Sequence, residues 1–191
     1  MQRRTVDPHT SMPLQVLTQP AYHGSPYTFD EFKLQHVGTG EGGQGYGWGL
    51  YFTDRAKIAQ QYGTRLYSVN IPEQGQLLDW YKMISEQSAA VKAALLRNPV
   101  TAEFVNRYPS NATGRDLYHF LVQAAQKKNP TFSNSQSAEN ASKQLLAVGV
   151  PGLTCLSYSS NGKPTGARNF VVFDDSQIYV TQPAEGSAAY S

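Results

Sequence analysis

The order of strand-like and helix-like segments is the feature that most constrains the fold of this chain. Segments with strand composition open and close it; they are residues 21–26, 50–54, 65–71, 152–159 and 169–180. Three segments between them carry apolar residues at helical spacing; they are 85–98, 114–128 and 137–150. Ser85 is the expected N-cap of the first of them. Strands, a helical insert and strands again favour an α+β domain over an alternating parallel-sheet fold.

The length of 191 residues fits one domain with a sizeable core. Residues 1–20 carry three prolines and little periodicity, which predicts a flexible N-terminal arm whose end can form a short strand. We expect the domain to span 21–180 and residues 181–191 to form a loose C-terminal tail.

Composition limits the partners of this domain. The formal net charge of +2 does not indicate a nucleic-acid-binding surface, although a local basic patch remains compatible with it. No run of apolar residues is long enough to span a bilayer and no apolar signal core follows the N-terminus, so we expect a soluble protein without a membrane partner. The single cysteine, Cys155, excludes an internal disulfide, and its apolar setting predicts a packed thiol.

Several common catalytic patterns are missing. The histidines share no metal-ligand spacing, so no metal site is predicted; they are His9, His23, His36 and His119. Gly38, Gly40 and Gly43 formally match G-x-G-x-x-G, but that dinucleotide-binding pattern requires a helix directly after the glycines. Here a strand-like aromatic segment follows, which argues against a Rossmann fold.

The remaining motifs point to one family. "YHGS" at 22–25, "GLYFTD" at 49–54, Tyr62 and "NFVVFD" at 169–174 follow one another in this order. This series resembles the diphtheria-toxin and poly(ADP-ribose)-polymerase class of ADP-ribosyltransferases, whose signature is His, Tyr and a third residue that is usually Glu. The chain is more closely similar to the ADP-ribosyltransferase-like domains of phage polyvalent proteins and bacterial effectors. The resemblance covers about residues 21–180 and implies a split β-sheet core with a helical insert.

The resemblance implies NAD as the co-substrate and assigns residues to it. By motif match, His23 binds the hydroxyl of the adenine-side ribose, and the backbone of Gly24 holds the nicotinamide amide. Ser25 contacts the nicotinamide-side ribose. Tyr51 and Tyr62 stack on the two faces of the nicotinamide ring.

Seven glycines occupy the twelve positions 38–49, directly before Tyr51. Glycine lets backbone amides approach a ligand closely, so we expect this loop to border the NAD cleft, with Gly49 among the contacts. Trp48 is the expected anchor of its hinge. A mobile flap whose glycines only satisfy turns is the alternative.

Asn169 stands where classical members carry the catalytic glutamate. Asparagine can make the hydrogen bond to the ribose but supplies neither negative charge nor a general base, which favours single transfer over poly(ADP-ribose) synthesis. Glu41 is the first candidate to supply the charge, followed by Asp174 and Glu86. A site that binds NAD without turnover stays open.

The predicted function is that of a mono-ADP-ribosyltransferase, a glycosyltransferase that modifies a side chain of a target protein; a host protein such as ubiquitin is among the candidates. Modification of RNA or DNA is the less favoured alternative, and a non-catalytic NAD-binding module is another. The loop 159–169 precedes the third motif, and Lys163 and Arg168 in it are candidate acceptor contacts. A loop that is only a flexible connector is equally consistent with the sequence. A bacterial effector or toxin, made in the cytoplasm and delivered as a virulence factor into a host or rival cell, or a phage-encoded modifier fits these features. The sequence leaves the oligomeric state open.

Overall fold

The computed structural model describes residues 17–38, 45–158 and 161–186. Its described part is an α+β domain with one seven-stranded mixed sheet, in the order β4-β5-β6-β2-β1-β3-β7. The strands are β1 (Thr18–Ser25), β2 (Leu50–Thr53), β3 (Arg65–Pro72), β4 (Leu78–Asp79), β5 (Gly152–Tyr158), β6 (Pro164–Val172) and β7 (Tyr179–Gly186). The α+β class expected from the order of segments is confirmed.

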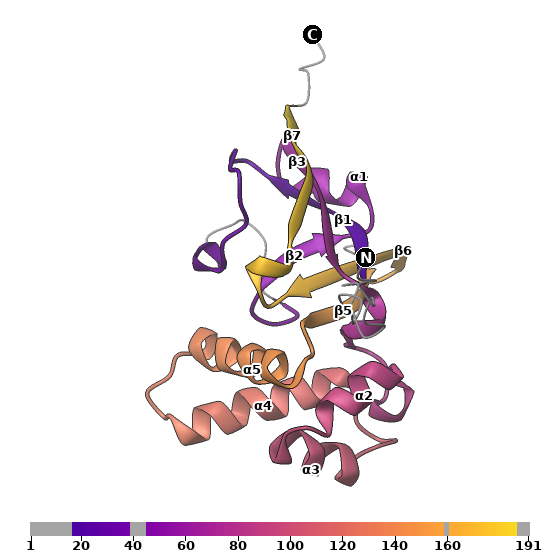
Figure 1. The fold of residues 1–191 in the computed structure, drawn as a ribbon, viewed down its shortest axis with the longest axis vertical. Coiled ribbons are helices and arrows are strands. Elements are labelled where there is room, and N and C mark those ends of the chain that lie inside the picture. Colours follow the sequence, from indigo (N-terminus) through magenta and orange to yellow (C-terminus); the bar gives the residue numbers. More distant parts are fainter. Residues whose placement is uncertain (1–16, 39–44, 159–160, 187–191) are drawn as a thin grey trace, which may run out of the picture.

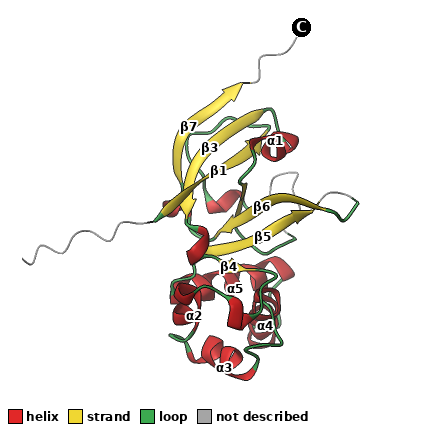
Figure 2. Ribbon diagram, turned by 90° about the vertical axis from the view of Figure 1, so that its right-hand side faces the viewer, coloured by secondary structure: helices red, strands yellow, loops and turns green. Residues whose placement is uncertain are grey.

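The sheet is split between its central strands. β1 pairs with β3 along its whole length, from Thr18–Pro72 to Ser25–Arg65. On its other side β1 pairs with β2 only at Tyr22–Thr53. Figure 2 shows the resulting halves, with β1, β3 and β7 in one group and β4, β5 and β6 in another. This is the split core that the motif order implied.

Four of the five described helices form one unit at one end of the molecule (Figure 1), beside the edge strand β4 (Figure 2). We call α2 (Ala89–Leu95), α3 (Pro99–Arg107), α4 (Gly114–Lys128) and α5 (Asn134–Val148) the helical unit. The fifth helix, α1 (Ala56–Ala59), follows β2 and continues as a 3-10 turn over Gln60–Tyr62.

Local sequence signals explain where the two long helices begin and end. The hydroxyl of Thr113 accepts from the amide of Asp116, whose carboxylate accepts from the amide of Thr113, so a capping box starts α4. Ser133 and Gln136 form the same arrangement at the start of α5. Gly149 ends α5 with φ of 95°, a conformation that glycine adopts readily.

The helix expected over 85–98 differs in detail. Its N-cap is Ser88, whose hydroxyl accepts from the amide of Val91, and not the predicted Ser85. After α2 the chain starts a new helix, because Asn98 caps the amide of Val100 and Pro99 occupies the first turn. The α3 helix was not expected from the sequence.

Side chains of β6 alternate between two hydrophobic clusters. Val171, and Phe173 directly after the strand, belong to the cluster beneath the helical unit, which also buries Cys155. Phe170 and Val172 belong to the cluster on the other face, with Tyr67 and Ile71 of β3. Because successive strand residues point to opposite faces, one strand contributes to both cores. The predicted packed thiol at Cys155 agrees with its 1% exposure.

Two strands extend beyond the segments expected to be ordered. β1 begins at Thr18, inside the expected arm, and β7 continues to Gly186, inside the expected tail. The division of the chain into an arm, a domain and a tail stays a prediction. Within the described residues, no helix has the length and apolar character needed to cross a membrane.

Candidate functional site

A pocket of about 630 Å³ opens at the split of the sheet. Its volume lies within the range of about 300 to 1,000 Å³ that is usual for ligand sites. The pocket brings together predicted site residues from β1, β2, β6 and the turn after α1; they are His23, Gly24, Ser25, Gly49, Tyr51, Tyr62 and Asn169. The predicted Glu41 lies outside the described residues.

His23 crosses the split with its imidazole. Its Nδ1 lies 2.8 Å from the carbonyl oxygen of Tyr51 on β2. Because a carbonyl only accepts, Nδ1 carries the proton, and burial lowers the pKa of His23 below its ordinary value of 6.5. The ring is therefore neutral near pH 7, and its Nε2 holds a free lone pair that can accept a hydrogen bond from a hydroxyl group.

Aromatic rings surround this imidazole on the other core face. The ring centroids of Phe32 and Phe52 lie 5.1 Å and 5.7 Å from that of His23. Phe29 stacks on Tyr67 at 4.3 Å, and the Tyr67 hydroxyl accepts from the amide of Phe29 at 2.7 Å. This wall fixes the orientation of His23 and gives the pocket an apolar side.

Gly24 and Gly63 allow the segment of α1 to lie directly against β1. A Cβ atom at Gly24 would overlap the carbonyl of Ala59, and one at Gly63 would overlap the backbone of Ser25. This close approach places Tyr62 at the pocket, where its side chain is 52% exposed. The eleven-residue spacing of Tyr51 and Tyr62 therefore corresponds to a short helical turn packed on the first motif.

The hydroxyl of Tyr51 is hydrogen-bonded to the backbone of Tyr46 and Gly47, which precede β2. Its hydroxyl donates to the carbonyl of Gly47 at 2.7 Å and accepts from the amide of Tyr46 at 3.1 Å. Burial raises the pKa of the Tyr51 phenol, which therefore stays protonated. Tyr51 can offer a ring face to a ligand, but its hydroxyl is already engaged.

At Gly47 and Gly49, the glycines nearest to Tyr51, the space of a missing side chain is filled by other residues of the protein. A Cβ atom at Gly47, where φ is 124°, would lie 2.8 Å from Cζ of Tyr118. One at Gly49 would lie 2.7 Å from Cγ1 of Val171 and from the carbonyl oxygen of Val172. Gly45, in contrast, lines the pocket with open space around it. The expected close approach of glycines to NAD thus fits Gly45 and not Gly47.

Asn169 reaches the pocket from β6, where it pairs with Thr53 of β2 and Cys155 of β5. Within the described part of the chain, its side-chain amide has no hydrogen-bond partner. The neighbouring Cys155 is an inert thiol, because burial raises its pKa to about 12. Asn169 therefore offers a free amide donor and acceptor to a ligand.

The other carboxylates proposed to compensate for Asn169 lie elsewhere. Asp174 caps the amide of Ser176 at 3.0 Å, and Glu86 accepts from the amide of Met83 at 3.2 Å. Neither lines the pocket. The carboxylate that lines it among the described residues is Glu31, which pairs with Lys33 at 2.7 Å. No sequence motif pointed to this pair, because residues 29–37 have the pattern of an amphipathic segment.

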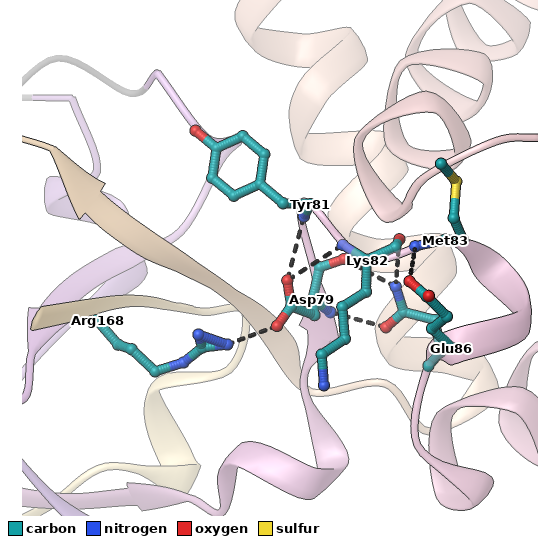
Figure 3. A network of polar contacts seen from close by, with 7 residues as sticks. Asp79, Tyr81, Lys82, Met83, Glu86 and Arg168 are labelled. Atoms are coloured by element: carbon teal, nitrogen blue, oxygen red, sulfur yellow. Dashed lines mark hydrogen bonds and ion pairs between the residues drawn. The ribbon is translucent and has the colours of Figure 1, made fainter. Parts of the chain in front are cut away.

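Arg168 is not available to an acceptor. Figure 3 shows its guanidinium directed at Asp79 of β4, with Nη2 2.5 Å from Oδ2 and side-chain exposures of 18% and 10%. The other oxygen of Asp79 accepts from the amide of Tyr81 at 3.1 Å. The expectation that Arg168 contacts an acceptor is therefore wrong: the residue joins β6 to β4. Lys163 is exposed on the β5–β6 turn.

No group of three or more histidine, cysteine, aspartate or glutamate side chains is placed to hold a metal ion in the ranges that the structure describes. The pocket chemistry consists of a neutral imidazole, tyrosine rings, a free amide and the Glu31–Lys33 pair.

Comparisons with known proteins agree with the order of the motifs. The model of a family described as "ADP-Ribosyltransferase in polyvalent proteins" matches residues 17–186. No curated protein matches the chain. Among solved structures, a chain described as "Crystal structure of an anti-CRISPR protein" aligns with a TM-score of 0.41 and 15% identity, over 88% of this chain and 99% of that one.

Proposed function

This chain belongs to the family of ADP-ribosyltransferases in polyvalent proteins, and from that premise we propose that it is a mono-ADP-ribosyltransferase that transfers ADP-ribose from NAD to a side chain of a target protein. One observation supports the proposal beyond the family match. Residues that lie up to 146 positions apart, from His23 to Asn169 (169 − 23), line one pocket.

In the proposed reaction, the bond between the nicotinamide nitrogen and the ribose carbon breaks and its electron pair stays on the nitrogen. A lone pair of the acceptor forms the new bond to that carbon, and the acceptor loses its proton to solvent or a base. The Nε2 lone pair of His23 accepts from a hydroxyl of the adenine-side ribose, and the backbone of Gly24 binds the nicotinamide amide. Tyr51 and Tyr62 hold the nicotinamide ring between them, each contact contributing about 0.5 to 1.5 kcal/mol beyond burial.

Asn169 acts in this proposal as a hydrogen-bond partner of the ribose. The free amide can orient a hydroxyl, but a neutral group does not offset the positive charge that develops on the ribose. We therefore propose slow, single transfer and no chain elongation. Glu41 and Glu31 are the candidate sources of negative charge; Glu31 is placed at the pocket, paired with Lys33.

The acceptor is proposed to be a protein, and the β5–β6 turn with Lys163 is proposed to contact it. With Arg168 neutralised by Asp79, the turn contributes less positive charge than its sequence indicates. This weakens the alternative of a nucleic-acid acceptor, which would require several cationic contacts. A role as a delivered effector or toxin, or as a phage-encoded modifier of a host protein, fits this activity.

The test uses labelled NAD and two tyrosines with the same exposure. Tyr62 of the pocket and Tyr179 of β7 are each 52% exposed, so Tyr62→Ala and Tyr179→Ala remove matched side chains. Wild-type protein and both variants are incubated with labelled NAD in a bacterial lysate and in a eukaryotic lysate. We expect wild type and Tyr179→Ala to label a macromolecule, and Tyr62→Ala to label it about twofold to tenfold more slowly, since a lost stacking contact of about 0.5 to 1.5 kcal/mol corresponds to that range.

Treatment of the labelled product identifies the acceptor class. Label that protease removes and nuclease leaves supports a protein acceptor, whereas the reverse pattern supports RNA or DNA. Absence of label, with NAD binding retained in calorimetry, would favour the non-catalytic module. Absence of both label and NAD binding in the wild type would overturn the proposal.

A further inference from the structure

Trp48, between the close-packed Gly47 and Gly49, has both its amide and its carbonyl held by hydrogen bonds to side chains. Its amide donates to the hydroxyl of Tyr118 at 2.9 Å. That hydroxyl lies 2.9 Å from Oγ of Ser142, which donates to the carbonyl oxygen of Trp48 at 2.8 Å. Ser142 uses its proton on that carbonyl, so the two side chains hold the Trp48 peptide at its amide and at its carbonyl oxygen.

Both side chains come from the helical unit and both are buried. Tyr118 of α4 is 2% exposed and Ser142 of α5 is 0% exposed. The one proton of the Tyr118 hydroxyl has two acceptors within 2.9 Å, the carbonyl oxygen of Ala138 and Oγ of Ser142. Both acceptors lie on α5, so the hydroxyl ties α4 to α5 as well as to Trp48. Hydrogen bonds of such a connected, buried network strengthen one another.

Both sequence neighbours of Trp48 connect it to the pocket. The carbonyl of Gly47, before Trp48, accepts from the hydroxyl of Tyr51, and Gly49, after it, leads into β2 and lines the pocket. A Cβ at Gly47 would lie 2.9 Å from the Tyr118 hydroxyl, so the absence of a side chain at Gly47 lets this hydroxyl reach the Trp48 amide. The position of the Tyr51 ring is therefore fixed by helices that themselves do not line the pocket.

We propose that Tyr118 and Ser142 are positioning residues for the NAD pocket: they hold the Trp48 peptide and through it the ring face of Tyr51. This inference rests on the proposed function for the ligand, whereas the hold on Trp48 is independent of it. The helical unit then belongs to the binding machinery, although it supplies no contact to the ligand.

Two serines of one helix provide a matched test. Ser137 and Ser142 both lie on α5 and both are 0% exposed, and each donates a hydrogen bond. Ser137 donates to the side chain of Gln126 within the helical unit, whereas Ser142 donates to Trp48. Ser142→Ala and Ser137→Ala thus remove the same atom from similar surroundings. Tyr118→Phe keeps the ring and removes the hydroxyl that receives the Trp48 amide.

Three quantities are measured for each variant: hydrogen exchange of the Trp48 amide, the Kd for NAD, and the separate kcat and KM of transfer. We expect Tyr118→Phe to speed exchange of the Trp48 amide by at least about tenfold and Ser142→Ala to weaken NAD binding by about threefold to tenfold, the loss of one buried hydrogen bond. Ser137→Ala should leave the exchange rate of the Trp48 amide and the Kd for NAD within about twofold of wild type. It should lower the stability of the protein about as much as Ser142→Ala does, because each variant loses one buried hydrogen bond.

The outcomes separate this inference from the proposed function. If the wild type binds NAD and Ser142→Ala binds it as tightly as Ser137→Ala does, the positioning role is wrong while the proposed function stands. If the wild type does not bind NAD, the proposed function fails, and amide exchange still decides whether the helical unit holds Trp48. Should Tyr118→Phe not fold, the pair of serine variants decides alone.

Discussion

His23 is the residue whose chemistry depends most on burial. Burial lowers the pKa of its imidazole, so the folded chain binds this proton more weakly than the unfolded chain does. Lowering the pH below about 6.5 therefore favours the unfolded state, and the free energy of unfolding falls as the pH drops through the folded-state pKa. Above about pH 6.5, His23 contributes no pH dependence.

The first prediction compares wild type with His23→Asn, whose amide nitrogen can replace Nδ1 as the donor to Tyr51. We expect the stability of the wild type, measured by urea unfolding at pH 7.5 and pH 5.5, to decrease more than that of the variant. Other titrating groups are common to both proteins, so the difference isolates His23. Equal losses in the two proteins would show that His23 binds its proton as it does in the unfolded chain.

Asn169 leads to the second prediction. Asn169→Ala removes the free amide and should lower kcat by about twofold to tenfold, the effect of one hydrogen bond. Asn169→Asp keeps the shape and adds a charge near the developing positive centre, so it should raise kcat above that of wild type. Initial rates of nicotinamide release measure both. An Asn169→Ala variant as active as wild type would remove Asn169 from the site.

Cys155 gives the third prediction, which is one of no effect on chemistry. Its thiol is protonated and buried in the hydrophobic cluster beneath the helical unit, with a pKa raised to about 12. Cys155→Ala should therefore transfer ADP-ribose at the wild-type rate while losing about 1 kcal/mol of stability for the small cavity. The folded wild type should also resist a thiol reagent at pH 8. Loss of activity in a folded Cys155→Ala protein would mean that the site is assigned to the wrong residues.

At the scale of elements, the ion pair between Arg168 and Asp79 joins β6 to the edge strand β4 (Figure 3). The fourth prediction is that Asp79→Asn, which places an amide donor against the guanidinium, lowers the free energy of unfolding by about 3 to 5 kcal/mol. Glu139→Gln makes the same exchange in the surface pair with Lys143 and should cost at most about 0.5 kcal/mol. Chemical denaturation of both variants provides the comparison, and equal costs would contradict the prediction.

Elements that carry their own boundary signals were the ones the sequence predicted well. The capping boxes of Thr113 and Ser133 mark α4 and α5, and both helices form close to where periodicity placed them. The segment 85–98 has two serines suited to capping, and packing selects Ser88 over Ser85. The α3 helix was not predicted because its β-branched residues weaken the helical pattern, although Asn98 and Pro99 signal its start.

At the scale of the whole molecule, the order of strand-like and helix-like segments predicted the fold class, and the family resemblance of the motifs predicted residues that meet at the pocket. Contacts between distant side chains could not be predicted in the same way. Arg168 and Asp79 are 89 positions apart, and Trp48 is 70 and 94 positions from Tyr118 and Ser142. Each of these side chains reads as an ordinary polar or aromatic residue in its own segment. The partners of these side chains become visible only when the helical unit packs on the sheet.

The split of the sheet has a consequence for the shape of the site without any ligand. Beyond the pair Tyr22–Thr53, β1 and β2 share no further backbone pairing, yet the carbonyl of Tyr51 is not left without a donor, since Nδ1 of His23 takes that place. The imidazole of His23 thus replaces a backbone amide as the hydrogen-bond donor between β1 and β2, and it reaches farther from its strand than an amide does. The width of the opening in the sheet is set by the reach of one imidazole.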